Sequence, residues 1–320
     1  MGKVRFAQQS DNPSPSTEEV VHLILAQEVG GMVRYSPRAR EGHDPEAVHQ
    51  LRVRARRLRS ELEIVAPVIR AKPLRHMRSD LKWVGGVLGR QRDLDVLFEL
   101  LSSLSDEPSH CLDGMVLESL DARRAKESRR VQTMIGSKRY RQLVRELSAA
   151  ADHPPLRRDA SLPASEVLHP GLTHTVKLLF ETVDLYGTSP TNLELHEIRI
   201  MTKRARYCAE VASTYLGERA TNVATTFAEA QGILGNLHDQ VGAIVYLSAQ
   251  RLLLDRDFTF VASSEAPSAA IDWLTNSVTG LLLRWREPLE RARGLSEDLE
   301  VRPMKVRSFF ESHVLLSEIR

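Results

Sequence analysis

The first of two similar motifs in the chain reads His49-Gln50-Leu51-Arg52-Val53, followed by Arg56-Arg57-Leu58-Arg59. The second motif, 147 residues later, reads His196-Glu197-Ile198-Arg199-Ile200, followed by Lys203-Arg204-Ala205-Arg206. A further pair of matches, offset by 146 residues, is Leu88-Gly89-Arg90-Gln91-Arg92-Asp93 and Leu234-Gly235-Asn236-Leu237-His238-Asp239. Two matches in nearly the same register indicate an internal duplication. We therefore expect two related halves.

The spacing of apolar residues in the first motif predicts an amphipathic helix. Val48, Leu51, Ala55, Leu58 and Leu62 recur every three or four residues and fall in one stripe. Asp44-Pro45-Glu46 is a typical helix start, with Asp as N-cap and Pro in the first position. Another helix is expected over residues 275–293. No run alternates like a strand, so we expect an all-α fold.

A basic stripe lies beside this apolar stripe. With Leu51 at zero on a helical wheel, the angles between about 80° and 160° hold His49, Arg52, Arg56 and Arg59. His196, Arg199, Lys203 and Arg206 take the same angles in the second motif. Such cations repel one another by a few tenths of a kcal/mol per pair, unless acids such as Glu63 or an anionic ligand neutralise them. The repetition of the stripe favours a ligand.

Arginine suits phosphate because its planar fork donates two parallel hydrogen bonds and stays charged. A linear polyphosphate carries about one charge per unit, which matches stacked arginines, and its binding should weaken steeply with salt. Arg75, Arg78 and Lys82 would extend the track, although a solvated helix face explains them equally well. We interpret Asp93 and Asp239 as salt-bridge partners of the basic side chains.

Charge is unevenly distributed over the 320 residues. The formal net charge is +2, yet residues 34–92 hold 15 Lys/Arg and 6 Asp/Glu. The first 150 residues are net +6 and the remainder net −4, so we expect the first half to hold more of the ligand. Cys111 and Cys208 form no metal or disulfide pattern, and no signal or membrane-spanning run is found. We expect a cytoplasmic protein with no cofactor, no metal and no membrane partner.

The organisation predicted along the chain has four parts. Residues 1–16 are expected to be a disordered tail and 17–151 the first helical half. The segment 152–170 carries four prolines and is expected to be a linker, and 171–320 form the second half. A second break is expected at 257–267.

On these motifs the sequence resembles the CHAD family, the conserved histidine α-helical domain, over roughly residues 17–315. The resemblance implies two four-helix bundles related by a pseudo-twofold axis, with a basic groove or channel between them. It also implies polyphosphate binding without catalysis and association with polyphosphate granules. The family's histidines fall on His49 and His196. Its basic positions fall on Arg52, Arg56, Arg57, Arg59, Arg199, Lys203, Arg204 and Arg206.

Two other functions remain open from the sequence. A metal-dependent phosphohydrolase is suggested by the His238-Asp239 pair, but its further metal ligands have no convincing candidates. Non-specific nucleic-acid binding is compatible with a basic surface. It is less favoured because only Trp83 and Tyr207 lie near the basic stripe for base stacking, and both are better explained as core or rim.

Overall fold

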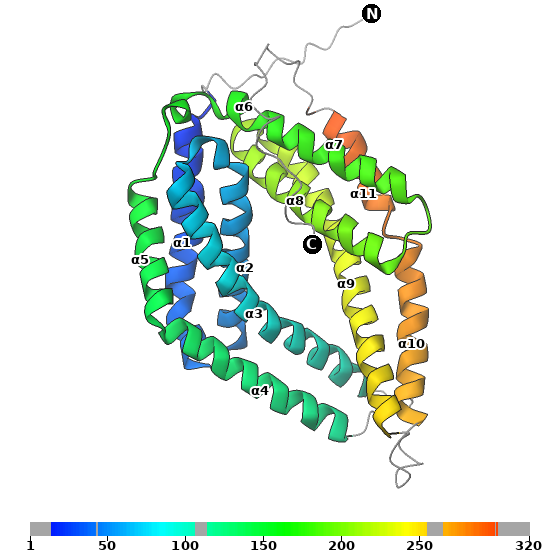
Figure 1. Ribbon diagram of the computed structural model, residues 1–320. Coiled ribbons are helices and arrows are strands. Elements are labelled where there is room, and N and C mark those ends of the chain that lie inside the picture. Colours follow the sequence, from blue (N-terminus) through cyan, green and yellow to red (C-terminus); the bar gives the residue numbers. More distant parts are fainter. Residues whose placement is uncertain (1–13, 43, 106–113, 255–264, 298, 300–320) are drawn as a thin grey trace, which may run out of the picture.

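The computed structural model describes residues 14–42, 44–105, 114–254, 265–297 and 299, and within them it contains helices but no strand. The expected all-α fold is confirmed. In chain order the helices are α1 Thr17–Glu41, α2 Pro45–Ile64, η1 Ala66–Val68, α3 Ala71–Ser105, α4 Gly114–Gly136, α5 Lys138–Asp152, η3 Arg158–Ser161, α6 Ala164–Val167, α7 His169–Tyr186, α8 Asn192–Leu216, α9 Glu218–Leu254, α10 Glu265–Leu282 and α11 Glu287–Glu297 (Figure 1).

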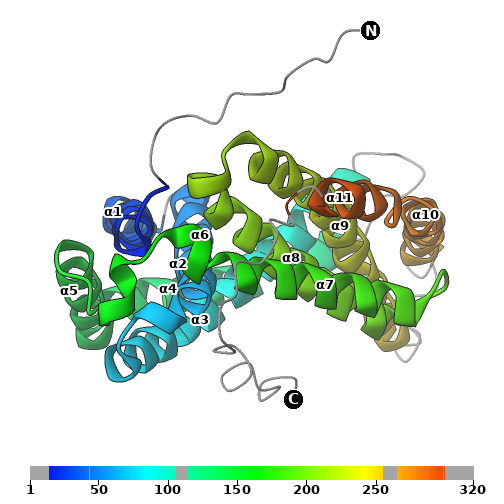
Figure 2. The ribbon, with the colours of Figure 1, turned by 90° about the horizontal axis from the view of Figure 1, so that it is seen from above.

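The two halves repeat the same order of packing. In the first half α1 packs on α2, α2 on α3 and α3 on α4; in the second, α7 packs on α8, α8 on α9 and α9 on α10. The two basic motifs lie on α2 and α8, which occupy equivalent places in this order. Seen from above, α1 and α5 lie at one end of the molecule and α10 and α11 at the other (Figure 2). This arrangement agrees with a duplication.

Three hydrophobic clusters hold the helices together. One lies among α1, α2, α3 and α5 and includes the fully buried Leu51 and Leu58. A second lies among α7, α8, α9 and α11. The third, not anticipated from the sequence, joins Leu101 of α3 and Leu120 of α4 to Leu247 of α9 and Leu274 of α10. The simple picture of two separate bundles is therefore incomplete.

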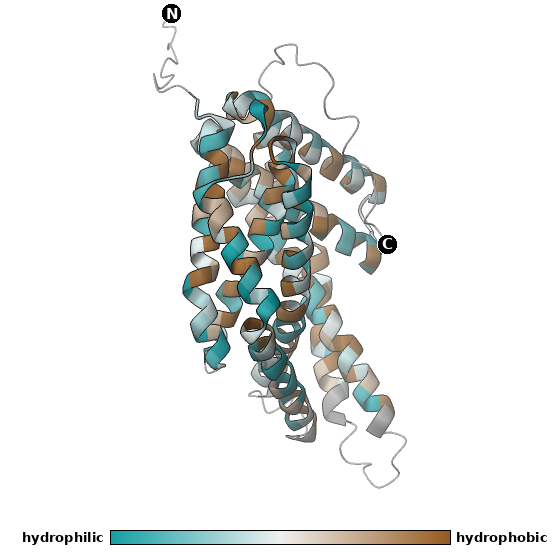
Figure 3. Cartoon of the chain, turned by 60° about the vertical axis from the view of Figure 1, so that its left-hand side comes forward, coloured by the Kyte–Doolittle hydropathy of each residue, from teal (hydrophilic) through white to brown (hydrophobic). Residues whose placement is uncertain are grey.

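The third cluster follows from helix length. At 1.5 Å per residue, α3 and α9 are each more than about 50 Å long, which exceeds the width of one small bundle. Their far ends carry apolar residues that neither of the first two cores covers, so these ends pack on each other and on α4 and α10 (Figure 1). Brown and teal segments alternate along the helices, as expected when each helix buries only one face (Figure 3).

The predicted start of α2 is confirmed. Asp44 caps α2 by accepting a 3.0 Å hydrogen bond from the backbone N–H of Ala47, as predicted. Thr191 forms a capping box with Glu194 at the start of α8. The single helix expected over 275–293 is wrong, because α10 ends at Leu282 and α11 begins at Glu287. Pro288, which cannot donate to the preceding turn, favours this restart.

The proline-rich segment 152–170 ends α5 but packs against the first half. It contains η3, α6 and the start of α7, and Ala160, Ala164 and Leu168 are buried in the first core. Its backbone is tied by a 2.8 Å hydrogen bond from Arg157 N–H to Val68 C=O. Residues 1–13 of the expected tail and most of the expected break at 257–267 lie outside the described residues, while Ser16 caps α1.

Candidate anion-binding site

The basic stripes of the two repeats face each other, because α2 contacts α8 directly. Leu58 of α2 and Ala205 of α8 are fully buried, each in the core of its own half. The stripe beside each apolar face is thereby turned toward the other half. A side-chain hydrogen bond joins the helices, since Arg56 Nε donates to the Tyr207 hydroxyl across 3.1 Å.

Five cations from three helices gather here, and we call them the central cation cluster: Arg52, Arg56, Arg92, Arg199 and Lys203. Burial is the main cause that lowers the pKa of Arg52, and Arg56, Arg92 and Arg199 lower it further. Burial also lowers the pKa of Arg199, helped by the charge of Arg56. Equivalent positions of the two repeats thus lie within electrostatic range of each other.

Lys203 is the most strongly perturbed member of the cluster. Burial lowers the pKa of its ammonium to about 7, and the charges of Arg199, Arg56, Arg52 and Arg206 act in the same direction. An anionic partner close to this lysine would favour its charged form and raise its pKa again. The electrostatics of the site are therefore those of a concentrated, partly desolvated positive charge.

Carboxylates neutralise only part of this charge. Asp93 Oδ1 lies 3.6 Å from Arg52 Nη2, with the Asp93 side chain largely exposed. Burial raises the pKa of Asp239, against the opposing effect of the nearby Arg199 charge. In the described part of the chain, neither Arg56 nor Lys203 forms an ion pair within 4.0 Å. The prediction that Asp93 pairs with a basic side chain is confirmed, because Asp93 pairs with Arg52.

Two buried polar atoms at the site have no hydrogen-bond partner among the described residues: His49 Nδ1 and Arg199 Nε. Such atoms are costly unless a partner satisfies them. Burial lowers the pKa of His49, followed by the charge of Arg92, so its imidazole is neutral at pH 7. A neutral imidazole would serve as a hydrogen-bonding group rather than as a further cation.

The second-half histidine lies beside one that was not among the predicted site residues. The ring centroids of His196 and His238 are 5.2 Å apart. Burial, followed by the charge of Arg199, lowers the pKa of His238. Arg92 was likewise missed as a site residue. The signal that would have found both is the second pair of sequence matches, in which Arg92 and His238 occupy equivalent positions.

Arg57 is the predicted site residue that the structure assigns elsewhere. Its guanidinium lies 2.9 Å from Glu210, 3.4 Å from Glu61 and 3.6 Å from Glu28. The reason is angular, because Arg57 is one residue beyond Arg56 and so points about 100° away from it. Arg57 belongs to a structural ion network that ties α1, α2 and α8 together.

The remaining predicted residues are not members of the central cation cluster. Arg206 is held by Glu210 at 2.7 Å and by Gln231 at 3.3 Å. Arg78 pairs with Glu63 at 3.5 Å, so Glu63 offsets a cation of α3. The other four side chains are exposed: Arg59, Arg75, Lys82 and Arg204.

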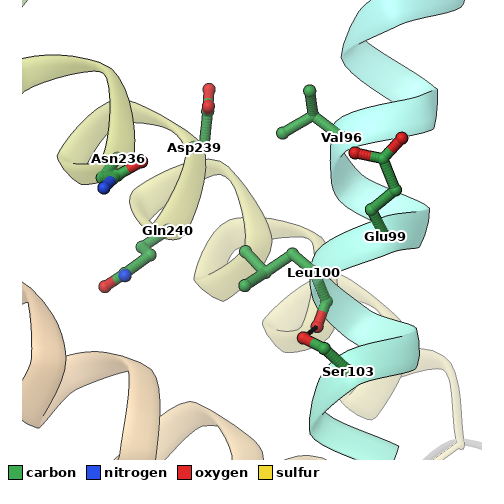
Figure 4. A pocket seen from close by; sticks show the side chains of 7 residues that line it. All are labelled: Val96, Glu99, Leu100, Ser103, Asn236, Asp239 and Gln240. Atoms are coloured by element: carbon green, nitrogen blue, oxygen red, sulfur yellow. Dashed lines mark hydrogen bonds between the residues drawn. The ribbon is translucent and has the colours of Figure 1, made fainter. Parts of the chain in front are cut away.

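A cavity of about 300 Å³ adjoins the cluster between α3 and α9. Figure 4 shows Glu99 and Val96 on one wall and Asp239 on the other. Glu99 accepts a 3.1 Å hydrogen bond from Arg92. With two carboxylates and no lysine or arginine in its lining, this cavity would repel phosphate. The place that suits an anion is the cluster itself.

Two further features of the described structure concern metal-ligand groups and membrane-spanning helices. Across the described ranges, no group of three or more His, Cys, Asp or Glu side chains is placed to hold a metal ion. No helix in those ranges is long and apolar enough to cross a membrane.

Comparison with known proteins gives concordant matches. The chain is 26% identical over 263 residues to the "Uncharacterized protein MT2285" of Mycobacterium tuberculosis (strain CDC 1551 / Oshkosh), covering 79% of this chain and 49% of that protein. It thus spans about half the length of this relative. The CHAD domain of the plant Ricinus communis superposes with a TM-score of 0.63 at 25% identity, covering 90% of this chain and 96% of that one.

PptA from Streptomyces chartreusis shares the fold, with a TM-score of 0.63 at 20% identity over 89% of this chain and 99% of that chain. The model of the CHAD domain family matches residues 23–248, which include both basic motifs and α2, α3, α8 and most of α9. The chain therefore belongs to the CHAD domain family.

Proposed function

We propose that this protein binds inorganic polyphosphate at the central cation cluster and does not hydrolyse it. The observation that carries the proposal is the meeting of Arg56 and Lys203, from opposite repeats, without an ion-pair partner in the described part of the chain. Holding such charges together costs free energy in the absence of a ligand. A polyanion that entered between α2 and α8 would relieve this repulsion.

Polyphosphate suits the cluster better than a single small anion. The cations come from three helices, and the exposed Arg59, Arg75 and Lys82 would continue the positive surface beyond the cluster. Arg204, one residue beyond Lys203, instead points about 100° away from it. A chain with about one charge per phosphate unit can contact the cluster and its continuation, whereas one phosphate reaches only two or three cations. Neutral His49 would add a hydrogen bond without adding charge.

The proposal of binding without catalysis rests on the type of residue in the cluster. The four arginines of the cluster stay charged, so they hold and orient phosphate without accepting a proton, whereas hydrolysis also needs an activated water, commonly generated by a metal ion or a positioned base. Release of orthophosphate from long-chain polyphosphate, in the presence of Mg²⁺ or Mn²⁺, would contradict this part of the proposal.

The decisive experiment is titration with polyphosphates of defined length at several salt concentrations. We expect a steep dependence of log affinity on log salt, whose slope grows with chain length up to a plateau. The plateau measures the number of phosphate contacts. An affinity independent of salt would contradict binding at this cluster.

Nucleic acid is the competing ligand to exclude. Tyr207 is 2% exposed, so its ring offers no platform on which an unpaired base could stack at the cluster. We expect long-chain polyphosphate to displace RNA at a much lower concentration of phosphate units. Equal displacement by RNA and polyphosphate would favour a general polyanion binder.

In the cell we further propose a cytoplasmic protein that associates with polyphosphate granules. Fluorescence microscopy of the tagged chain, compared with the Arg52→Glu, Arg56→Glu variant, tests this part. Wild-type signal at granules with a diffuse variant is the expected result.

A further inference from the structure

A second positively charged groove lies between α3 and α4, outside the central cation cluster. Its volume is about 520 Å³, within the range of small-molecule sites. Its lining comes from α3, α4 and the turn after α4, and comprises Trp83, Val87, Arg90, Lys126, Arg129, Arg130, Thr133, Met134 and Ser137.

Positive charge in this groove exceeds negative charge. Lys126 and Arg129 are exposed and form no ion pair with any described residue. Arg90 and Arg130 share a single buried carboxylate, Glu127, which lies 3.4 Å from Arg90 Nε. Four cations thus face one carboxylate, which leaves the groove with a net charge of about +3 at pH 7.

The groove and the central cluster lie on different sides of α3. Residues two apart on a helix point about 160° away from each other. Arg92 acts electrostatically on His49 and Arg52 of α2, whereas Arg90 contacts Glu127 of α4. A ligand in the groove would therefore leave the central cluster free.

Apolar side chains form the other part of the lining. Trp83 and Val87 lie beside the cations and are partly exposed, whereas Met134 is 5% exposed and contributes little surface. Arg139 is stacked over the Trp83 ring at 4.2 Å and is fixed there by a 2.6 Å contact to Asp80. Because Arg139 covers one face of the Trp83 ring, a flat apolar group would pack against the remaining surface of Trp83 and against Val87, next to the charges.

We propose that this groove binds a nucleoside triphosphate. The phosphates would contact Lys126, Arg129 and Arg130, and the base would pack on the apolar side formed by Trp83 and Val87. A linear phosphate chain would use only the cations and leave the apolar side exposed to water. A nucleotide uses both, so the chemistry of the lining favours it.

The test measures by calorimetry how tightly ATP binds to the full chain that carries Arg52→Glu and Arg56→Glu. These two substitutions remove anion binding at the central cation cluster. Tripolyphosphate serves as the probe without a base. We expect ATP to bind and tripolyphosphate to bind at least about tenfold more weakly. Adding Lys126→Glu and Arg129→Glu should weaken ATP binding by at least about tenfold, because two cations that would contact phosphate become carboxylates that repel it.

Both groove substitutions are at exposed positions, and circular dichroism confirms that the helices persist. ATP affinity unchanged by Lys126→Glu and Arg129→Glu would overturn the proposed site. Tripolyphosphate binding as tightly as ATP would overturn the assignment of a nucleotide. The groove variant with wild-type Arg52 and Arg56 should still bind long polyphosphate, so failure here is distinguishable from failure of the proposed function.

Discussion

Arg56 of α2 donates a hydrogen bond from Nε to the hydroxyl of Tyr207 on α8, across 3.1 Å. The two residues belong to different repeats, and Tyr207 is buried, so the bond fixes one cation of the first repeat against a rigid part of the second. An arginine oriented in this way loses little conformational freedom when it binds phosphate. Preorganisation of this kind is what a binding site for a flexible polyanion needs.

Charge reversal in the first repeat should abolish polyphosphate binding without unfolding the protein. In the Arg52→Glu, Arg56→Glu variant the new carboxylates repel phosphate, and both side chains are only partly buried. Substitution by Gln instead should reduce the salt slope by about one per cation removed. Calorimetry gives the affinity and circular dichroism the helix content.

A matched control for this variant is Lys177→Glu on α7, a position that is 71% exposed and, among the described residues, paired only with Glu181 at 3.8 Å. Its polyphosphate affinity should match that of the wild type. Binding by the double variant that equals that of the control would rule out the central cluster as the site.

Polyphosphate affinity should fall as the pH rises through about 7. The pKa of Lys203 lies near 7, so the ammonium is charged below that pH and neutral above it. Bound phosphate raises this pKa, and binding near pH 7 should therefore take up protons. Calorimetry in buffers of different ionisation enthalpy measures the uptake.

Lys203→Arg provides the control for the pH effect, since guanidinium stays charged over this range. We expect its affinity to vary less between pH 6 and 8 than that of the wild type. The same pH profile in both proteins would assign the effect to another group.

Removal of the Glu61 charge should stabilise the protein at alkaline pH. Burial raises the pKa of this carboxyl to about 7, with a further contribution from Glu28. Between pH 4.5 and 7 the folded state then holds a proton that the unfolded state has released, so the free energy of unfolding falls as the pH rises through this window.

Glu61→Gln should reduce the pH dependence of the free energy of unfolding. At pH 8 it should raise this free energy by at most about 3 kcal/mol, which appears as a higher midpoint of urea unfolding. Chemical denaturation at pH 5 and pH 8 measures both terms. A variant that loses more stability at pH 8 than at pH 5 would show that the ionised carboxylate is stabilising in the network of Glu28, Arg57 and Glu210.

Leu58→Asp should unfold the first half. Leu58 is 0% exposed in the core of α1, α2, α3 and α5, and burying a carboxylate there should cost more than about 4 kcal/mol. Leu185→Asp, at a position 78% exposed, is the control that should retain its helix content. A stable, helical Leu58→Asp protein would mean that the buried stripe of α2 is misassigned.

Local pattern and duplication were enough to predict the class of fold and the start of α2. Asp44 and Pro45 act within one turn of the helix, so their role can be predicted without knowledge of any distant contact. The period of Leu51 and Leu58 likewise identifies the buried face. The stripes of Arg52 with Arg56 and of Arg199 with Lys203 follow from the same period, because the angle between two helical residues depends only on their spacing.

Tertiary structure alone decided which of these side chains meet. Arg57 is adjacent to Arg56 in sequence but faces Glu28 and Glu210, which come from α1 and α8. The third hydrophobic cluster also arises from contacts between helices distant in the chain, and the groove of Lys126 and Arg129 arises from the packing of α4 on α3. Sequence specifies the direction of a side chain on its own helix, whereas the burial and charge that act on it depend on how the helices pack.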